Sequence, residues 1–315
     1  MRWSVSSAKI FSKCQRKWYF TQIAASHGKK DPLRREIYLL KQLKSISAWR
    51  GILVDTVIKK AIVPELLLRK IPSEDKVLKF ASSIIERQLE FGRALRFREP
   101  DMTKSKAGDD YAAFYDLEYN DGLDDTKIQT AIEEIEASLL NLLKSNFLKN
   151  IFQSSSQIIA QRTLTHYFEY TTLTCTPDLI VFFERSEPMV VDWKVHAFGT
   201  VEYWLQLGIY GYVLSLIEPH RDFPKEFQLV SGSLDNYKLI EYQLLRNQIR
   251  KYSLSRQDIA DLEDYIFNSI NQMKRLVNGK KYKELDINLF QTTRFPNICT
   301  RCEFKKICWK DDEYE

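Results

Sequence analysis

The sequence predicts an α/β protein in which a helical N-terminal half is followed by a mixed core of strands and helices. Three observations predict this class. Apolar residues recur at helical spacing through most of the chain up to residue 152, short alternating segments begin at residue 157, and a cysteine-rich tail follows the last helical pattern. The 315 residues, 44% of them apolar, allow one large domain or two of ordinary size.

The N-terminal half is expected to consist mainly of helices. Ser6 or Ser7 can cap a first helix that ends near Ile23. Further helices are expected at 37–43, 47–68, 73–98 and 126–152. Pro64 is expected to break or bend the second of these, and 101–125 is expected to be loop with a short helical piece. The apolar stripe of the last helix predicts packing on a core, because it is too short for a free coiled coil.

The second half is expected to build a mixed sheet with helices around it. Three consecutive strands are expected at 157–170, 172–183 and 189–195, and a strand pair at 227–231 and 238–244. Helices are expected at 201–217 and 255–278, followed by an irregular tail.

Composition and charge favour a cytoplasmic (or nuclear) protein with a polyanion-facing surface. No apolar run is long enough to span a bilayer, and the N-terminus lacks the apolar block of a signal peptide, so no membrane association is expected. Residues 1–70 contain 16 Lys or Arg and 4 Asp or Glu, whereas the rest of the chain contains 31 and 38. These basic residues could face a polyanion or could simply solvate helix surfaces.

Charged residues interrupt two expected strands in the stretch CTPDLIVFFERSEPMVVDWKV. Side chains two apart on a strand share a face, so Asp192 and Lys194 point the same way, and Asp178 on the preceding strand can reach that face. Two carboxylates and an ammonium suit a hard divalent cation, Mg²⁺ or Mn²⁺, with Lys194 beside the metal-bound water. The alternative interpretation is a surface salt bridge, because D-x-K tripeptides are common.

The neighbouring motifs resemble those of a known family. PDLIVFF, VVDWKV and the helical LQLGIYGY, which places Gln206 and Tyr210 four residues apart on one face, are similar to motifs of the PD-(D/E)XK nucleases, specifically the RecB-like branch. The resemblance implies a restriction-endonuclease-like core with a mixed central sheet flanked by helices. It also implies that Gln206 and Tyr210 steady the site and the nucleic-acid backbone.

The same resemblance assigns roles to the charged residues. It implies that Asp178 and Asp192 ligate the metal with help from the backbone carbonyl of Trp193, and that Lys194 orients or deprotonates the attacking water. The RecB-like branch usually carries a histidine ligand in a G-x-x-x-H context on an early helix. This chain reads GILVD, so Asp55 takes that position, where it could still bind a metal or could mark reduced catalysis.

Three cysteines crowd the C-terminus in NICTRCEFKKICWK. Cys299 and Cys302 are spaced C-x-x-C, and Cys308 follows six positions later. Thiolates this close together need a metal or cluster and a fourth ligand, either Cys14 or Cys175, and both zinc and an iron–sulfur cluster accept four thiolates. For Cys14 the alternative interpretation is a buried thiol on an apolar helix face.

A second resemblance concerns the cysteines. S-x-S-x-x-x-x-F-x-x-C near the N-terminus and C-x-x-C-x-x-x-x-x-C near the C-terminus are similar to the RecB-like group that includes CRISPR-associated adaptation nucleases and the AddB nuclease domain. The resemblance implies a [4Fe–4S] cluster on the four cysteines Cys14, Cys299, Cys302 and Cys308. We expect the cluster to be structural, because thiolate ligation supplies folding energy. Cys175 is then expected to be a packing residue.

The motifs divide the chain into four expected segments. These are the N-terminal helices of the nuclease domain (1–72), a helical insertion (73–155), the nuclease core (156–290) and the cluster-binding tail (291–315).

The combined prediction is a Mg²⁺- or Mn²⁺-dependent DNA nuclease, an exonuclease rather than an endonuclease, acting on single strands or DNA ends in repair, recombination or CRISPR and other defence. The expected phosphate contacts are Lys9, Lys13, Arg16 and Lys17. Four nearby aromatic rings could stack on bases or could belong to the core: Trp3, Trp18, Tyr19 and Trp49. For Trp18 we expect a place in the core. The first alternative is a weak or inactive nuclease-fold scaffold, which Asp55 in place of histidine supports. A zinc-held adaptor is the second alternative.

Overall fold

The computed structural model describes residues 2–28, 30–184, 186–195, 203–218, 220–225, 227 and 234–308. The chain divides into two compact units, each assembled from segments that are distant in the sequence. Unit 1 contains Met1–Arg2, Ile46–Gln88 and Asp124–Tyr265. Unit 2 contains Trp3–Ser45, Leu89–Leu123 and Ile266–Glu315.

A five-stranded mixed sheet forms the centre of unit 1. Its strands, in spatial order, are β2 (Gln157–Ala160), β5 (Leu179–Phe183), β6 (Ser186–Lys194), β7 (Lys238–Gln243) and β8 (Gln248–Tyr252). β6 and β7 are parallel, and the other neighbours are antiparallel. β5 and the middle of β6, from Met189 to Val191, are apolar on both faces because helices cover the sheet on both sides. The predicted α/β class with a mixed central sheet is confirmed.

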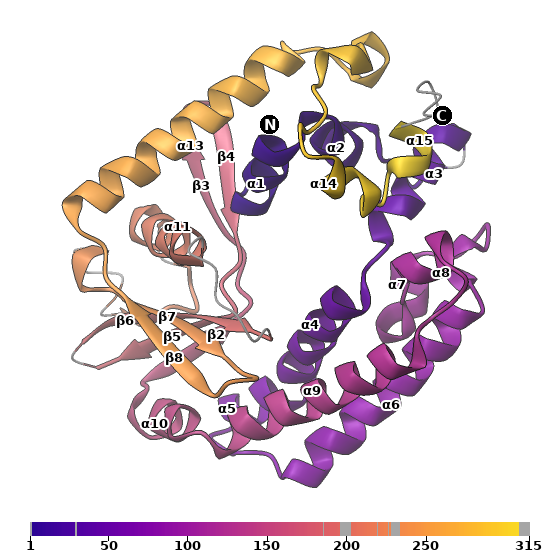
Figure 1. The fold of residues 1–315 in the computed structure, drawn as a ribbon. Helices are drawn as coiled ribbons and strands as arrows, with labels where there is room; N and C mark the ends of the chain where they lie inside the picture. The colour runs from indigo at the N-terminus through magenta and orange to yellow at the C-terminus, as the bar shows by residue number, and fades with distance from the viewer. Residues whose placement is uncertain are drawn as a thin grey trace. The chain divides into compact units, whose positions relative to one another are not determined.

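Helices α11 (Tyr203–Leu216) and α10 (Asn146–Ser154) lie on opposite faces of this sheet (Figure 1). α11 approaches β7 closely at Gly211, where a Cβ atom would lie 3.0 Å from a methyl group of Leu239. On the other face the ring of Phe147 in α10 packs on Tyr242 of β7. The close approach of α11 brings its side chains down to the end of β6.

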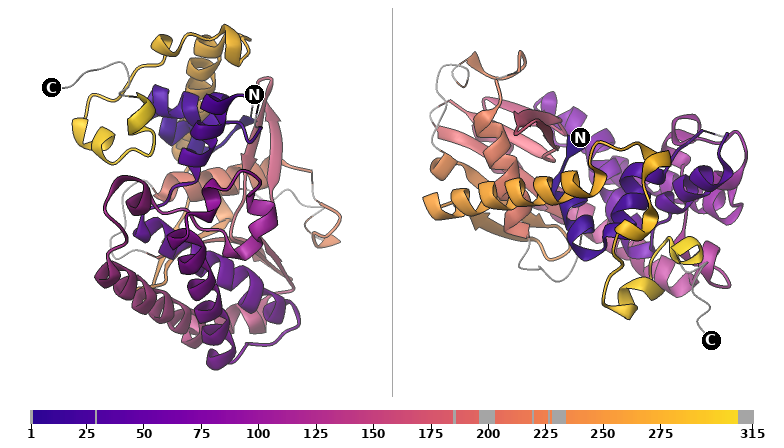
Figure 2. Two further views of the ribbon diagram at one scale, coloured as in Figure 1. Left: turned by 90° about the vertical axis from the view of Figure 1, so that its right-hand side faces the viewer. Right: turned by 90° about the horizontal axis from the view of Figure 1, so that it is seen from above.

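The strand hairpin before β5 belongs to a second, three-stranded sheet of order β1-β4-β3. Its strands are β1 (Arg2–Trp3), β3 (Leu164–Phe168) and β4 (Thr171–Cys175). The β3–β4 hairpin projects beyond the five-stranded sheet (Figures 1 and 2). The strands expected at 157–170 and 172–183 are therefore each split in two. Gln161 takes a left-handed conformation (φ 46°), and Pro177, which has no N–H to donate to a ladder, lies between β4 and β5.

The other helices of unit 1 lie where the sequence pattern predicts helices, but the helix expected at 126–152 is divided at Ser145, which ends one helix and caps the next. Their bounds are α4 (Ile46–Val57), α5 (Val63–Leu67) and α9 (Asp125–Lys144), while α6 (Glu74–Arg93) and α13 (Arg256–Val277) each continue into unit 2. Pro64 lies in the first turn of α5, after a π-helical turn at Ile58–Ile62, which explains the expected break. β8 was not predicted, and residues 228–231, most of the strand expected at 227–231, lie outside the described residues.

Unit 2 joins the N-terminal helices to the C-terminal tail. Its helices are α1 (Val5–Lys13), α2 (Gln15–Tyr19), α3 (Pro32–Gln42), α7 (Lys104–Ala107), α8 (Tyr115–Tyr119), α14 (Pro296–Thr300) and α15 (Lys305–Cys308). Ser4, rather than Ser6 or Ser7, caps α1, and its hydroxyl accepts from the Ser7 N–H at 3.2 Å. The rings of Trp18 and Tyr19 pack on Phe290, so the two ends of the chain share one core.

The aromatic residues proposed to stack on bases are core residues in the structure. All four are at most 6% exposed: Trp3, Trp18, Tyr19 and Trp49. Trp18 donates its indole N–H to Ser7, and Trp49 donates to Gln88. The stacking interpretation is therefore wrong for these rings, and the core interpretation is correct.

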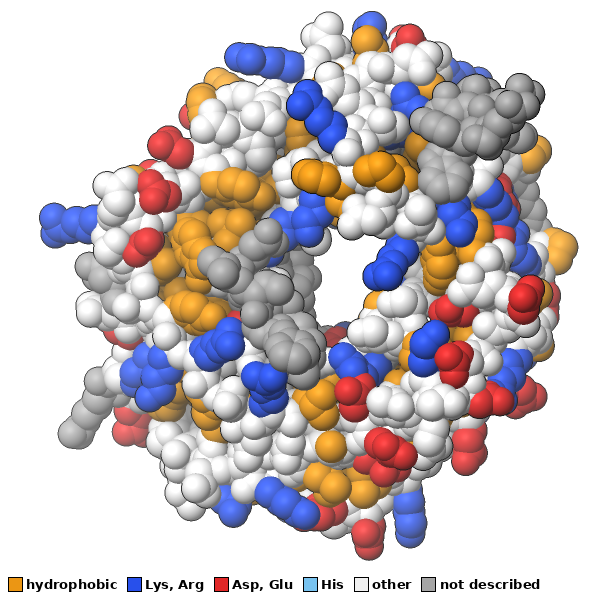
Figure 3. Space-filling model, in the orientation of Figure 1, with side chains coloured by type: hydrophobic (Ala, Val, Ile, Leu, Met, Phe, Trp, Pro, Cys, Tyr) orange, Lys and Arg blue, Asp and Glu red, His pale blue; other side chains and the backbone are white. Residues whose placement is uncertain are grey.

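Charge is distributed in small groups. On the face in Figure 3, Lys and Arg side chains are interspersed with Asp and Glu side chains. Two of the expected phosphate contacts hold the tail instead: Lys17 pairs with Glu303 at 2.6 Å, and Arg16 Nε donates to the Phe290 carbonyl at 3.2 Å. Within the described ranges, no helix combines the length and apolarity needed to cross a membrane.

Candidate active site

A cavity of about 430 Å³ opens in unit 1 where α4, α11 and the end of β6 meet. Six of the predicted site residues line it: Asp55, Asp178, Asp192, Lys194, Gln206 and Tyr210. Asp55 is on α4, Asp178 directly precedes β5, Asp192 and Lys194 end β6, and the last two are on α11.

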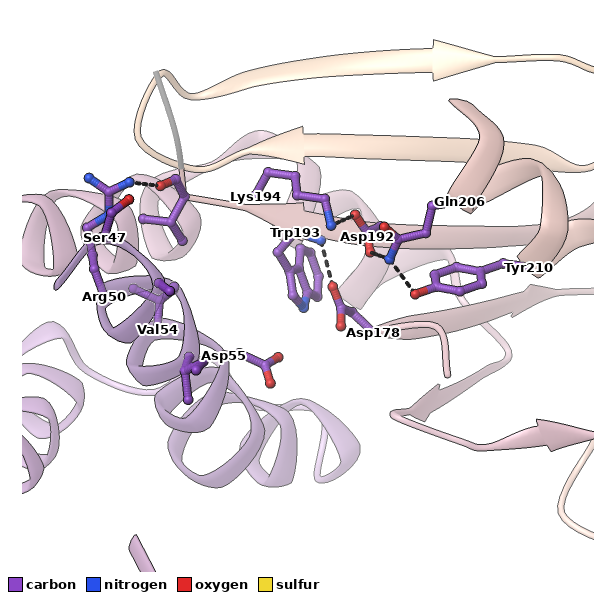
Figure 4. A pocket seen from close by; sticks show the side chains of 14 residues that line it. Ser47, Arg50, Val54, Asp55, Asp178, Asp192, Trp193, Lys194, Gln206 and Tyr210 are labelled. Carbon is purple, nitrogen blue, oxygen red and sulfur yellow. Dashed lines mark hydrogen bonds and ion pairs between the residues drawn. The ribbon is translucent and has the colours of Figure 1, made fainter. Parts of the chain in front are cut away.

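Asp192 is held by contacts on both sides of its carboxylate (Figure 4). Lys194 Nζ forms an ion pair with Asp192 Oδ2, and Gln206 Nε2 donates to Asp192 Oδ1 at 3.1 Å. The same Gln206 amide donates to the Tyr210 hydroxyl at 2.5 Å. Asp192 is only 3% exposed, so these contacts compensate for the desolvation of its carboxylate. Burial, together with the charge of Asp192, raises the pKa of Tyr210 and keeps its hydroxyl protonated.

Asp178 is fixed by the backbone of the neighbouring strand. Its Oδ2 accepts from the Trp193 N–H at 2.8 Å. Burial, and then the negative charges of Asp192 and Asp55, raise the pKa of Asp178 well above its usual value, against the effects of that hydrogen bond and of Lys194. The carboxyl groups therefore repel one another in this cavity.

Asp55 points from α4 toward Asp178 across the cavity (Figure 4). Burial raises its pKa, and so does Asp192, although Lys59 and the hydrogen bond from Gln161 act in the opposite direction. Three acids of like charge form a donor set that suits a hard divalent cation, since a cation would relieve their repulsion. In the part of the chain that the structure describes, no group of three or more His, Cys, Asp or Glu is arranged to hold a metal ion.

The comparison with known families decides the assignment of the fold. The family described as "PD-(D/E)XK nuclease superfamily" matches residues 2–309. The chain belongs to this superfamily. A search of curated proteins finds no match. A crystal structure from Eubacterium rectale, provisionally described as an exonuclease, is similar over 87% of this chain and 90% of that chain, with 11% identity and a TM-score of 0.36, which is too low to support an argument.

Gln161, which contacts two of the acids of this cavity, was missed by the sequence analysis. Its Nε2 donates to Asp55 Oδ1 at 2.8 Å, and its backbone N–H donates to the Asp178 carbonyl at 3.0 Å. One residue thus connects two of the acids, in a left-handed conformation that is uncommon for a non-glycine residue. The sequence offers no signal for it, because a glutamine after a short strand is unremarkable.

Arg50 is a second residue that was missed. Its guanidinium pairs with Glu134 of α9 and donates to the carbonyl of Val195, directly after Lys194. Arg50 Nε is buried and donates to no described group. A residue of the predicted insertion, Glu134, therefore contacts a residue that lines the cavity. The sequence signal for Arg50 is a charge at an otherwise apolar helix position.

β7 places two further polar residues beside the site. In the parallel register Asp192 is next to Glu241 and Lys194 is next to Gln243, so each pair shares a face of the sheet. Both β7 residues are fully buried, and Gln243 Nε2 donates to Glu241 Oε1 at 2.7 Å. The alternation of polar and apolar residues in KLIEYQ was a signal that could have identified them.

The four predicted cluster ligands line one small cavity of about 20 Å³ in unit 2: Cys14, Cys299, Cys302 and Cys308. Cys14 lies at the junction of α1 and α2, where its Sγ accepts from the Lys17 N–H at 3.4 Å. Burial, and then the charge of Glu303, raise the pKa of Cys302 to about 12 although Lys17 opposes them. Cys175 is buried at the end of β4, and burial raises its pKa to about 12.

Proposed function

We propose that the protein is a metal-dependent DNA nuclease that hydrolyses phosphodiester bonds of single strands or DNA ends, as an exonuclease. The observation that carries this proposal is that three acids and Lys194 line one open cavity in a member of a nuclease superfamily. This activity would serve DNA repair, recombination or defence in the cytoplasm.

The candidate metal ligands are Asp55, Asp178 and Asp192. Mg²⁺ or Mn²⁺ on these carboxylates would lower the pKa of a bound water and stabilise charge on a phosphoryl oxygen. The fit rests on the donor set of three carboxylates. Burial raises the pKa of Asp178 first, and the negative charges of Asp192 and Asp55, which a cation would compensate, raise it further.

The remaining site residues position the reacting groups. Lys194 Nζ, held against Asp192, would orient the attacking water or take its proton. Gln206 would keep Asp192 oriented through its amide, with Tyr210 fixing that amide in turn. Because the pKa of Tyr210 is raised, its hydroxyl remains a neutral donor for the nucleic-acid backbone.

A nuclease assay with end-labelled single- and double-stranded DNA tests this function. With Mg²⁺ or Mn²⁺ we expect hydrolysis by the wild type and a decrease of about 10²- to 10⁴-fold in Lys194→Ala and Asp192→Ala. Lys238→Ala, an exposed lysine at the start of β7, is the matched control. Equal hydrolysis by all variants contradicts the assigned site, and cleavage of circular single strands contradicts exonuclease action.

For the four cysteines we propose a structural [4Fe–4S] cluster, with zinc as the alternative. The support is that the four thiols line one small cavity, since thiolates gathered in this way can hold a cluster or a zinc ion. Protein purified without oxygen should be brown with broad visible absorbance. A colourless protein that contains zinc contradicts the cluster.

The second candidate function is a DNA-binding scaffold that retains the nuclease fold, favoured by Asp55 at the usual histidine position. The assay separates the two functions. A wild type that binds DNA but hydrolyses none with either metal supports the scaffold, and restored hydrolysis in Asp55→His would identify residue 55 as the cause.

A further inference from the structure

The tip of the β3–β4 hairpin carries two exposed aromatic rings. Tyr167 is 67% exposed and Tyr170 is 81% exposed, and among the described residues these are the two most exposed large apolar side chains. The tryptophans near the basic N-terminal helices are buried instead. Exposed rings of this size are costly to leave in water and are typical of recognition surfaces.

The two residues of the turn between the strands adopt a backbone conformation that is unfavourable for residues with side chains. Glu169 and Tyr170 both have left-handed φ angles, 45° and 57°, as a two-residue hairpin turn requires. Asn-Gly or Gly-Gly would adopt this conformation at lower cost.

The base of the hairpin is attached to the candidate active site at both of its ends. Before β3, Gln161 bonds to Asp55 and to the backbone of Asp178. After β4, Asp178 follows three residues beyond Cys175. The strands pair along their full length, from Leu164 with Cys175 to Phe168 with Thr171, so continuous strand pairing connects the tip to the base.

The length of the hairpin sets the reach of its tip. Thr171 precedes Asp178 by seven residues, which span at most about 23 Å at the rise of a strand. At 3.4 Å per nucleotide of a stacked strand, this is roughly six to seven nucleotides from the scissile phosphate. A DNA strand that enters the cavity can therefore also contact the tip.

We propose that Tyr167 and Tyr170 form a stacking site for unpaired nucleobases of the substrate strand, several nucleotides away from the cleaved bond. The proposal rests on the proposed nuclease function for the identity of the strand. Stacking suits this task because every base offers a π-face and the contact tolerates any sequence. Single-stranded regions would therefore bind at the hairpin, whereas paired bases could not reach the rings.

Fluorescence anisotropy of a labelled dT strand of about 20 nucleotides, measured without divalent metal to prevent hydrolysis, tests the site. We expect Tyr167→Ala and Tyr170→Ala each to weaken binding about 5- to 150-fold, and Tyr167→Phe to bind like the wild type. Thr165→Ala, exposed on the same strand, and Phe267→Ala, an exposed ring on α13, are the controls and should bind normally. Tyr170→Gly separates binding from folding, because it should weaken binding without lowering Tm.

A strand with abasic positions provides the decisive comparison. The wild type should bind the abasic strand as weakly as the double variant Tyr167→Ala/Tyr170→Ala binds intact dT. The double variant should bind the abasic strand and intact dT equally. The proposal is overturned if the wild type and the variants bind dT equally. It is also overturned if the substitutions weaken binding of a blunt duplex as much as they weaken binding of dT. If the tyrosine substitutions weaken binding but the wild type hydrolyses no DNA, the proposed nuclease function is contradicted while the stacking site is supported.

Discussion

Each unit brings together one type of metal-binding side chain, carboxylates in unit 1 and thiols in unit 2, but the two sets differ in their surroundings. In unit 1 the acids line a cavity of about 430 Å³, and hydrogen bonds from Trp193, Gln206 and Gln161 fix the three carboxylates. In unit 2 four thiols surround about 20 Å³. An open cavity with oriented acids suits a substrate, whereas four partly buried thiols around a small cavity suit a structural group that ties two chain ends together.

The largest effect should come from breaking the thiol set. Cys302→Ser is expected to prevent cluster binding and to destabilise unit 2 by several kcal/mol, because binding of a structural metal group supplies folding energy. Iron content, visible absorbance and thermal unfolding would measure the loss. Cys175→Ser is the matched control, since Cys175 lies outside this cavity and should leave the iron content unchanged.

The second-largest effect should show whether metal binding by the acids depends on the hydrogen bonds that orient them. Gln161→Gly removes the amide that contacts Asp55 while keeping a residue that adopts a positive φ without cost. We expect hydrolysis to fall about 10- to 100-fold, as is typical when a partner of a metal ligand is lost. Isothermal titration with Mn²⁺ should show weaker binding, and unchanged affinity would remove Gln161 from the site.

The third effect concerns the link from α9 to the end of β6. Glu134→Gln leaves the buried Arg50 guanidinium without its carboxylate and should cost about 1–3 kcal/mol of unfolding free energy. Chemical denaturation measures it, with the exposed neighbour in Glu133→Gln as control. If both variants unfold alike, the ion pair contributes nothing.

The smallest effect is a gain in stability. The pKa of Asp178 is raised above 3.8 in the folded protein. The stability that the protonated carboxyl group contributes is therefore fully present below pH 3.8 and is lost as the pH rises through the raised pKa. Metal-free Asp178→Asn should therefore be more stable than the wild type at neutral pH, by about 1 kcal/mol, or roughly 2–4 °C in Tm. Added Mg²⁺ should raise the Tm of the wild type only. A lower Tm in the variant would show that the carboxylates do not repel one another.

Much of the site follows from local periodicity. Asp192 and Lys194 are two apart on one strand, and Gln206 and Tyr210 are four apart on one helix, so strand and helix geometry alone align each pair. The central strands of the sheet were recognisable because they are continuously apolar, as is usual for strands buried on both faces.

The contacts that the sequence analysis missed depend on long-range pairing. Glu241 lies beside Asp192 only because β6 and β7 are parallel, and no local pattern specifies which strand becomes the neighbour. β8, QIRKY, is an edge strand with charged exposed positions, so it lacks the apolar alternation of a recognisable strand. The burial of Trp18 beside basic residues depends on Phe290, which is 272 positions away in the sequence.

The pairing of β6 on both of its edges limits which length changes the gene can tolerate. A single residue inserted into or deleted from β6 would turn Asp192 and Lys194 to the opposite side of the sheet, while both neighbouring strands resist the slip. One codon gained or lost there should be far more harmful than most single replacements. Length variants selected for nuclease activity should therefore be rare in β6.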